Sequence, residues 1–194
     1  MSRSPDPIAR FLDTFERAKK KESADPTACA LATADGSGVP SVRMVLLKGV
    51  DDRGFVFYTN YGSRKSAELD ENPRAALCFY WQVLREQVRV EGRVERISGE
   101  ESDEYFATRS RTSQVGAWAS KQSQALASRA ELVARFVKYE TKFALSSVPR
   151  PTFWGGYRVI PERMEFWFNQ AHRLHDRRLY VVESGKWTER RLFP

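Results

Sequence analysis

The chain has 194 residues, with 32 Lys and Arg against 25 Asp and Glu, so its formal net charge is +7. Its 41% hydrophobic and 12% aromatic content can build a sizeable core and excludes a disordered, collagen-like or repeat protein. No apolar run approaches the roughly 18 residues of a membrane-spanning helix, and the N-terminal sequence lacks the apolar centre of a signal peptide. We therefore expect a single domain over residues 1–194, located in the cytoplasm and without a membrane partner.

The first half of the chain changes from helical to strand periodicity. Apolar residues recur at helical spacing over residues 7–19, which predicts a helix within an N-terminal arm of residues 1–24. From Thr27 onward, short apolar or alternating runs are separated by turn sequences such as ADGSG, DDRG and ENPR. These runs predict strands over residues 28–34, 41–48, 54–60, 75–82 and 86–97.

The second half of the chain returns to helices and then to strands. Helical spacing over residues 100–109 and 123–144 is followed by three further predicted strands, near residues 156–160, 163–168 and 177–192, the last interrupted by a Glu-Ser-Gly-Lys turn. Many short strands with few helices, segregated along the chain, predict an α+β, mainly β fold built on a small barrel over residues 25–194. Neither GxGxxG nor GxxxxGK[ST] occurs, so no Rossmann or P-loop site is expected.

Basic residues gather in two early segments that could bind anions. In the strand over residues 43–48, alternation places Arg43 and Lys48 on opposite faces, so two separate anionic groups are conceivable. In the second segment, Ser63 can cap a short helix whose free N–H groups form an anion site together with Arg64 and Lys65. The alternative for each segment taken alone is a set of solvated surface charges.

A third cluster combines a phenol, a guanidinium and a hydroxyl group. Tyr105, Arg109 and Ser113 follow one another at spacings of four, and all three can donate hydrogen bonds to one phosphate. The alternative is a surface arginine beside a half-buried tyrosine. Nearby, Gln122 begins a predicted helix, and Gln87 lies on the polar face of a strand; such amides suit the edge of a heterocycle, because they both donate and accept.

The segment over residues 165–177 contains the only two histidines of the chain. Strand alternation would place Arg173, His175 and Arg177 on one face, beside Trp167, whose indole can stack on a planar ring. The odd spacing of the two histidines directs them to opposite strand faces, and no further histidine supplies a third ligand. We therefore predict no metal site.

The cysteines and the net charge indicate no other class of function. Cys29 and Cys78 lie in apolar strand-like runs rather than in a CxxC pattern, which predicts buried free thiols. The basic residues fall into separate clusters of a kind that binds small ligands, not into one continuous stripe, so we expect no nucleic-acid partner.

Taken together, these motifs resemble those of the pyridoxine/pyridoxamine 5′-phosphate oxidases, a family of FMN-dependent enzymes. The resemblance extends from about Asp25 to Pro194 and implies an FMN-binding split β-barrel with peripheral helices. It also implies a homodimer with the flavins at the subunit interface. The motifs that carry it are RMVLLK at 43–48, FYTNYGSRK at 57–65, QVRVEG at 87–92, YFATRSRTSQVGAWASKQS at 105–123, FWGGYRVIP at 153–161, and EFW with RLHDR between 165 and 177.

The resemblance assigns roles to individual residues. The implied FMN contacts are Arg43, Met44, Val45, Leu46, Leu47, Lys48, Tyr58, Thr59, Arg64, Lys65, Gln87, Gln122, Ser123, Trp167 and Arg177. The implied contacts to a phosphorylated B6 vitamer are Lys48, Tyr105, Arg109, Ser113, Arg173, Leu174 and His175. Arg173 and His175 are the implied catalytic residues, facing the substrate ring and its C4′ substituent.

The implied reaction oxidises pyridoxamine or pyridoxine 5′-phosphate to pyridoxal 5′-phosphate by hydride transfer to the flavin, which molecular oxygen then reoxidises with release of hydrogen peroxide. An amine substrate also releases ammonia when its imine is hydrolysed. Two alternatives remain open: a related split-barrel flavin oxidase of phenazine-type substrates, and a non-catalytic protein that binds flavin or pyridoxal phosphate. The presence of Lys48, Tyr105, Arg109 and Ser113 favours a phosphorylated substrate. The presence of Arg173 and His175 favours an enzyme.

Overall fold

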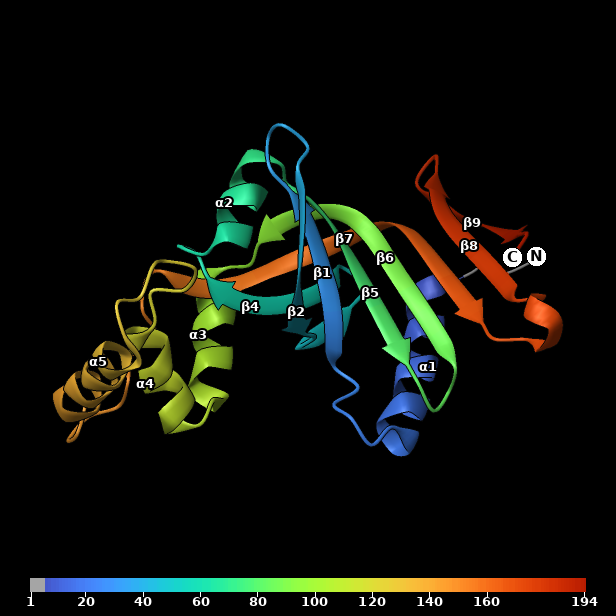
Figure 1. Ribbon diagram of the computed structural model, residues 1–194. Helices are drawn as coiled ribbons and strands as arrows, with labels where there is room; N and C mark the ends of the chain where they lie inside the picture. Colours follow the sequence, from blue (N-terminus) through green and yellow to red (C-terminus); the bar gives the residue numbers. More distant parts are fainter. Residues whose placement is uncertain (1–5) are drawn as a thin grey trace.

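The computed structural model describes residues 6–194; residues 1–5 of the predicted N-terminal arm lie outside the described part. Nine antiparallel strands form one strongly curled sheet in the order β2-β1-β5-β6-β7-β4-β3, with β8 pairing with both β7 and β9 (Figure 1). The strands are β1 (Ala28–Ala34), β2 (Pro40–Leu46), β3 (Gly49–Asp51), β4 (Gly54–Asn60), β5 (Arg74–Trp81), β6 (Glu86–Arg96), β7 (Trp154–Phe168), β8 (Asp176–Glu183) and β9 (Lys186–Leu192).

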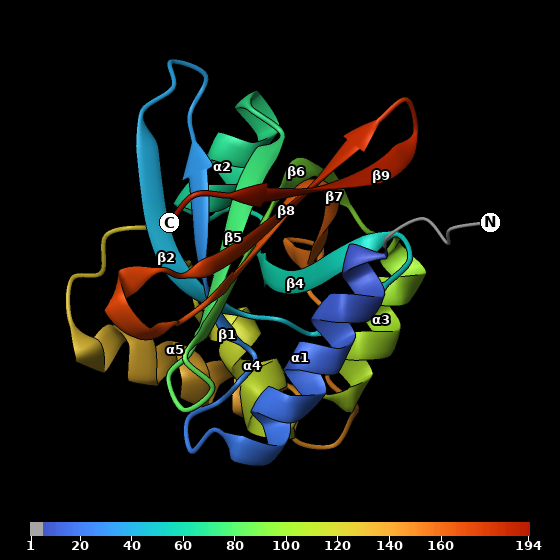
Figure 2. The ribbon, with the colours of Figure 1, turned by 90° about the vertical axis from the view of Figure 1, so that its right-hand side faces the viewer.

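The helices cover the sheet from different sides. Helix α1 lies along the opening of the curled sheet, and α3, α4 and α5 gather at the opposite end (Figures 1 and 2). The helices are α1 (Pro7–Lys21), α2 (Arg64–Glu71), α3 (Gly99–Thr108), α4 (Arg111–Ala119) and α5 (Arg129–Lys142), with a 3₁₀ turn, η1, over Ala171–Arg173. Within the described residues, no helix is long and apolar enough to cross a membrane.

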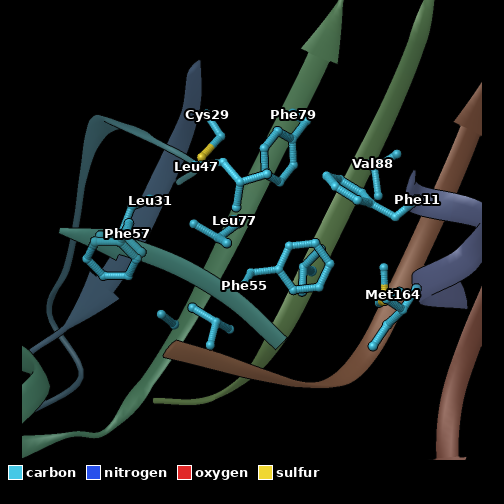
Figure 3. Close-up of a cluster of buried hydrophobic side chains, with 14 of the residues drawn as sticks. Phe11, Cys29, Leu31, Leu47, Phe55, Phe57, Leu77, Phe79, Val88 and Met164 are labelled. Carbon is cyan, nitrogen blue, oxygen red and sulfur yellow. The ribbon is translucent and has the colours of Figure 1, made fainter. Parts of the chain in front are cut away.

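Helix α1 closes the main core through its apolar face. Asp6 caps this helix by accepting hydrogen bonds from the N–H groups of Ile8 and Ala9, both at 3.0 Å. Phe11 is fully buried and makes edge-to-face contacts with Phe55 and Phe79, at ring-centroid distances of 4.8 and 5.1 Å (Figure 3). Burying such a side chain contributes roughly 2–3 kcal/mol, so α1 is part of the core rather than an accessory.

Strand β7 is a single strand of 15 residues, where the sequence predicts two strands over 156–160 and 163–168. Pro161 interrupts the apolar pattern but not the strand, because it lies at a β-bulge opposite Gly92, where the β6–β7 register shifts. A Cβ atom at Gly92 would lie 1.8 Å from the carbonyl oxygen of Ile160. Only glycine allows the two backbones to approach this closely.

The helical region after residue 100 also differs from the prediction. The expected helix over 123–144 begins only at Arg129, where the Ser128 side chain caps it by accepting from the N–H of Glu131 at 3.2 Å. Helix α4 was not expected, because its small residues give little helical periodicity. The Ser110 side chain caps this helix by accepting from the N–H of Ser113 at 3.3 Å. A serine at this position is the sequence signal that indicates a helix start. The α+β, mainly β class predicted from the sequence is confirmed.

The bulge contact predicts a large effect of one methyl group. Gly92→Ala would drive Cβ into the Ile160 carbonyl, so we expect a loss of about 2 kcal/mol or more in the free energy of unfolding, measured by urea denaturation. The control is Gly116→Ala within α4, where an added Cβ has nothing within 4 Å. Alanine is the better helix former, so this change should stabilise the protein by about 0.5–1 kcal/mol. Equal effects of the two substitutions would contradict the role of Gly92.

Candidate functional site

A cavity of about 770 Å³ opens between β2, β4, the start of α2 and the α3–α4 segment. This size is in the range of sites for multi-ring ligands. The residues predicted from the sequence that line it are Arg43, Met44, Val45, Leu46, Lys48, Tyr58, Thr59, Arg64, Lys65, Tyr105, Arg109, Ser113, Gln122 and Ser123.

One corner of the cavity contains a buried ammonium group. Lys65 is 6% exposed, and its Nζ donates to Thr59 Oγ1 at 2.9 Å and to Ser63 Oγ at 3.1 Å. Its third contact is Gln122 Oε1 at 3.4 Å, so all three partners are neutral oxygens. Burial, together with the nearby Arg43 charge, lowers the pKa of Lys65 to about 8. An anion in this corner would stabilise the charged form of the lysine and raise its pKa again.

The arginines of the same corner are held by a carboxylate. Glu68 accepts from Arg64 Nε at 2.8 Å and from Arg43 Nη2 at 3.2 Å. Although burial opposes ionisation, hydrogen bonds from Ser41, Thr33 and Arg64 lower the pKa of Glu68 to about 2. The N-terminal end of α2, which the Ser63 side chain does not cap, also lies at this corner and adds positive potential through the helix dipole. The corner is therefore suited to a phosphate group.

A second cationic position lies among aromatic rings. The Arg109 guanidinium lies 4.7 Å from the ring centroid of Trp154, and its Nη1 is buried with no hydrogen-bond partner among residues 6–194. Burial lowers the pKa of Arg109. The rings of Tyr58, Tyr105 and Trp154 lie nearly parallel, with Tyr58 at centroid distances of 3.9 Å from Tyr105 and 5.3 Å from Trp154, and burial raises the pKa of Tyr58 to about 12. A buried, unpaired guanidinium nitrogen is costly, so this position also suits an anion.

Two members of the 43–48 run differ from the strand-based expectation. Strand β2 ends at Leu46, so alternation does not extend to Lys48, and Arg43 and Lys48 line the same cavity instead of opposite faces. Leu47 is 4% exposed, and its side chain packs in the main core near Cys29 (Figure 3).

Cys29 is buried as expected, whereas Cys78 is only half-buried; both thiols are free.

A second group of predicted residues lies outside the cavity. Gln87 pairs with Trp167 across β6 and β7, and Trp167 pairs with Arg177 across β7 and β8. Arg177 Nε and Nη2 both lie 2.8 Å from Glu165 Oε1, and the Trp167 ring is 4.6 Å from that of His175. These residues form one continuous patch at the far end of the sheet.

The predicted strand alternation over 173–177 is wrong. Residues 171–173 form a 3₁₀ turn with His172 and Arg173 in left-handed conformations, at φ 57° and 61°, and β8 begins only at Asp176. Arg173 and Leu174 are exposed, and His175 Nδ1 accepts from the N–H of Gln170 at 3.2 Å. The turn lies at the end of the sheet opposite α3–α5 (Figure 1), so one chain does not bring these residues to its own cavity.

Sequence reasoning missed two residues that shape the cavity. Trp154 supplies the ring beneath Arg109, and Glu68 holds Arg43 and Arg64. The spacing of Arg64 and Glu68, four residues apart on a predicted helix, was a signal for their ion pair. No comparable local pattern connects Trp154 to Arg109, because their contact depends on the tertiary fold.

Comparison with known proteins agrees with this architecture. Residues 15–143 match the family model "Pyridoxamine 5'-phosphate oxidase", and residues 154–194 match "Pyridoxine 5'-phosphate oxidase C-terminal dimerisation region". Two curated relatives named pyridoxine/pyridoxamine 5′-phosphate oxidase, from Myxococcus xanthus (strain DK1622) and Rubrobacter xylanophilus, are each 58% identical over 190 residues. The alignments cover 98% of this chain and 92% and 88% of the relatives, respectively.

Solved structures have the same fold. PhzG from Burkholderia lata, in complex with tetrahydrophenazine-1-carboxylic acid, superimposes with a TM-score of 0.88 at 33% identity, covering 96% of this chain and 90% of PhzG. A pyridoxamine 5′-phosphate oxidase-related, FMN-binding protein from Nostoc punctiforme superimposes over the full length of both chains with a TM-score of 0.77 at 17% identity, a likeness of fold alone. The split-barrel expectation is confirmed, and the chain belongs to the pyridoxamine 5′-phosphate oxidase family of oxidoreductases.

Proposed function

We propose that this protein is an FMN-dependent oxidase that converts pyridoxamine 5′-phosphate, pyridoxine 5′-phosphate or both to pyridoxal 5′-phosphate, while molecular oxygen is reduced to hydrogen peroxide. With the amine substrate, hydrolysis of the imine consumes water and releases ammonia. One observation carries the proposal: a single cavity contains two separate cationic positions, one around Lys65 and one around Arg109. A phosphorylated cofactor and a phosphorylated substrate that bind side by side require such a pair. A cytoplasmic location remains a prediction from the sequence.

The Lys65 corner fits the phosphate of FMN. Lys65 lacks a carboxylate partner in the described chain, and Arg43 and Arg64 stand next to it. Thr59 and Gln122 can contact the rest of the cofactor from the same cavity. When bound, the flavin supplies the two-electron oxidation that no protein side chain can perform. The protein's part is to fix the cofactor by its phosphate end.

The Arg109 position fits the phosphate of the substrate. Its unpaired Nη1, the Tyr105 hydroxyl and the Ser113 hydroxyl can donate to the same group, and Lys48, which lines the same cavity, adds a charge. Two phosphate anchors in one cavity fix two planar molecules relative to each other. Positioning of this kind accounts for a large share of the rate enhancement in a reaction between two bound molecules.

The remaining site residues are proposed to come from a second copy of the chain. Gln87, Trp167 and Arg177 form one patch with the turn that carries Arg173 and His175, and this patch lies away from the chain's own cavity. The match of residues 154–194 to a dimerisation region supports a homodimer. In a two-fold dimer, each patch can complete the partner's cavity. Arg173 then places a positive charge beside the reacting carbon, and His175 orients the substrate or accepts its proton.

A phenazine-type substrate is the alternative suggested by the likeness to PhzG. A phenazine carboxylate carries one negative charge and two acceptor oxygens, whereas a phosphate monoester carries about −2 and three acceptor oxygens. The four donors that line the cavity, Lys48, Tyr105, Arg109 and Ser113, therefore favour a phosphorylated substrate.

The direct test is an aerobic assay of the purified protein with FMN and pyridoxamine 5′-phosphate. We expect flavin absorbance bands and equal amounts of pyridoxal 5′-phosphate and hydrogen peroxide. Pyridoxamine without its phosphate is the control, and it should react far more slowly because it cannot use the Arg109 anchor. Flavin bands without turnover would contradict the proposed oxidase activity, and failure to bind FMN would contradict the proposed cofactor.

The buried ammonium group predicts opposite effects on binding and stability. Lys65→Met should weaken FMN binding by roughly tenfold or more, measured by flavin fluorescence, because it removes a charge-assisted contact. Without FMN, the same variant should have a higher Tm at pH 7. The pKa of about 8 in the folded protein lies below the ordinary lysine value of 10.5. The charged lysine therefore lowers the free energy of unfolding below pH 8, and this loss of stability disappears as the pH rises towards 10.5. A lower Tm of the variant at pH 7 would contradict this account.

The shared site predicts complementation between two inactive variants. Arg109→Ala should lose substrate affinity, and Arg173→Ala should lose turnover far more than FMN content. When the two variants are co-expressed, random pairing gives one intact site in each heterodimer, so about a quarter of the wild-type activity should return. Separately purified homodimers of each variant are the control. Heterodimers that form but remain inactive would show that each chain builds its own site.

A further inference from the structure

The phosphate corner contains a carboxylate that the proposed cofactor cannot contact favourably. Glu68 is 5% exposed and lies on α2, facing β1 and β2. A buried glutamate next to an anion site is unfavourable unless it has a specific role, because it repels the anion. Its position between Arg43 and Arg64 indicates that role.

Each oxygen of Glu68 holds a different arginine. Oε1 accepts from Arg64 Nε at 2.8 Å, and Oε2 accepts from Arg43 Nη2 at 3.2 Å. The hydroxyl of Ser41 donates to both oxygens, and the hydroxyl of Thr33 donates to Oε2. The same two hydroxyls also accept from the Arg43 guanidinium. The carboxylate, the two hydroxyls and the two guanidinium groups therefore form one connected network.

This network decides which edge of each arginine remains available. Both Nη atoms of Arg43 are directed to Glu68, Ser41 and β1, which leaves Nε without a partner in the described chain. Arg64 is bonded through Nε, which leaves its Nη atoms without a partner there. Both residues line the cavity, so these free edges are the ones an anion can meet.

We propose that Glu68 is a positioning residue for the cofactor phosphate: its carboxylate fixes Arg43 and Arg64 in the orientations that receive the phosphate monoester. The inference rests on the proposed function, because it takes FMN as the ligand of this corner. The charges also match. Arg43, Arg64 and Lys65 together with Glu68 leave a net charge of +2 (three positive, one negative), opposite a phosphate monoester that carries about −2.

Orientation and simple charge predict opposite results when Glu68 is neutralised. If Glu68 acted only as a negative charge, Glu68→Gln would bind FMN more tightly. If it orients the arginines, the variant binds FMN more weakly, because a glutamine amide presents an NH₂ group to one guanidinium and releases it. Riboflavin, the same flavin without the phosphate, is the discriminating probe because it does not use these arginines.

The experiment measures the affinities of the apoprotein for FMN and for riboflavin by fluorescence titration. We expect Glu68→Gln to lose about tenfold or more in FMN affinity with riboflavin affinity unchanged. The matched control is Glu71→Gln, which removes the same charge from the same helix; Glu71 is exposed, and within the described part of the chain it accepts only from the N–H of Gly36, at 2.9 Å. This control should change neither affinity by more than about twofold.

Several outcomes would overturn the inference. Unchanged or tighter FMN binding by Glu68→Gln excludes the orienting role, and an equal loss of FMN and riboflavin affinity assigns Glu68 a structural role instead. If Glu68→Gln does not fold, the same titrations are made with Glu68→Asp, whose side chain keeps the charge but is too short to contact both arginines. Undiminished FMN affinity of Glu68→Asp would then overturn the inference. A wild-type protein that does not prefer FMN over riboflavin contradicts the proposed function itself, which separates the two failures.

Discussion

The pairing of β6 with the unbroken strand β7 is the constraint on which both halves of the site depend. Strand β7 begins with Trp154 beneath the Arg109 guanidinium and reaches Trp167 in the patch with Gln87. The two tryptophans are thirteen positions apart on this strand, a path length of roughly 40 Å along the extended chain. The bulge at Gly92 keeps this strand continuous through a proline. One chain therefore carries its cavity and the Trp167 patch at opposite ends of its sheet, and the proposed two-fold dimer would join them.

The site combines two kinds of cation. Lys65 and the Nη1 atom of Arg109 are buried against neutral groups, an arrangement that is unfavourable until an anion arrives. Arg43 and Arg177 are instead held by the buried carboxylates of Glu68 and Glu165. The unpaired cations provide affinity, while the paired ones are fixed in direction. A site that must bind a phosphorylated molecule and orient it precisely enough for reaction benefits from both.

The sequence and the structure agree where local patterns decide the outcome. The alternation of residues 28–34 predicts strand β1, and helical spacing after Asp6 predicts helix α1. Both signals act within a few residues of the chain. They disagree where the pattern is weak or broken. Helix α4 consists largely of small residues with little helical periodicity. Pro161 predicts the end of a strand, but β7 continues through it because the proline lies at the bulge opposite Gly92.

The sequence by itself determined the family, the mainly β class and the identity of most residues around the cavity, because these are carried by ordered local motifs. Only the tertiary structure decided which of those residues meet. It joined Lys48 to the cavity, placed the Leu47 side chain in the core and set Arg173 and His175 at the other end of the sheet. It also revealed Glu68 as the partner of Arg43. Such contacts depend on strand register and topology, which join residues far apart in the chain and leave no local pattern.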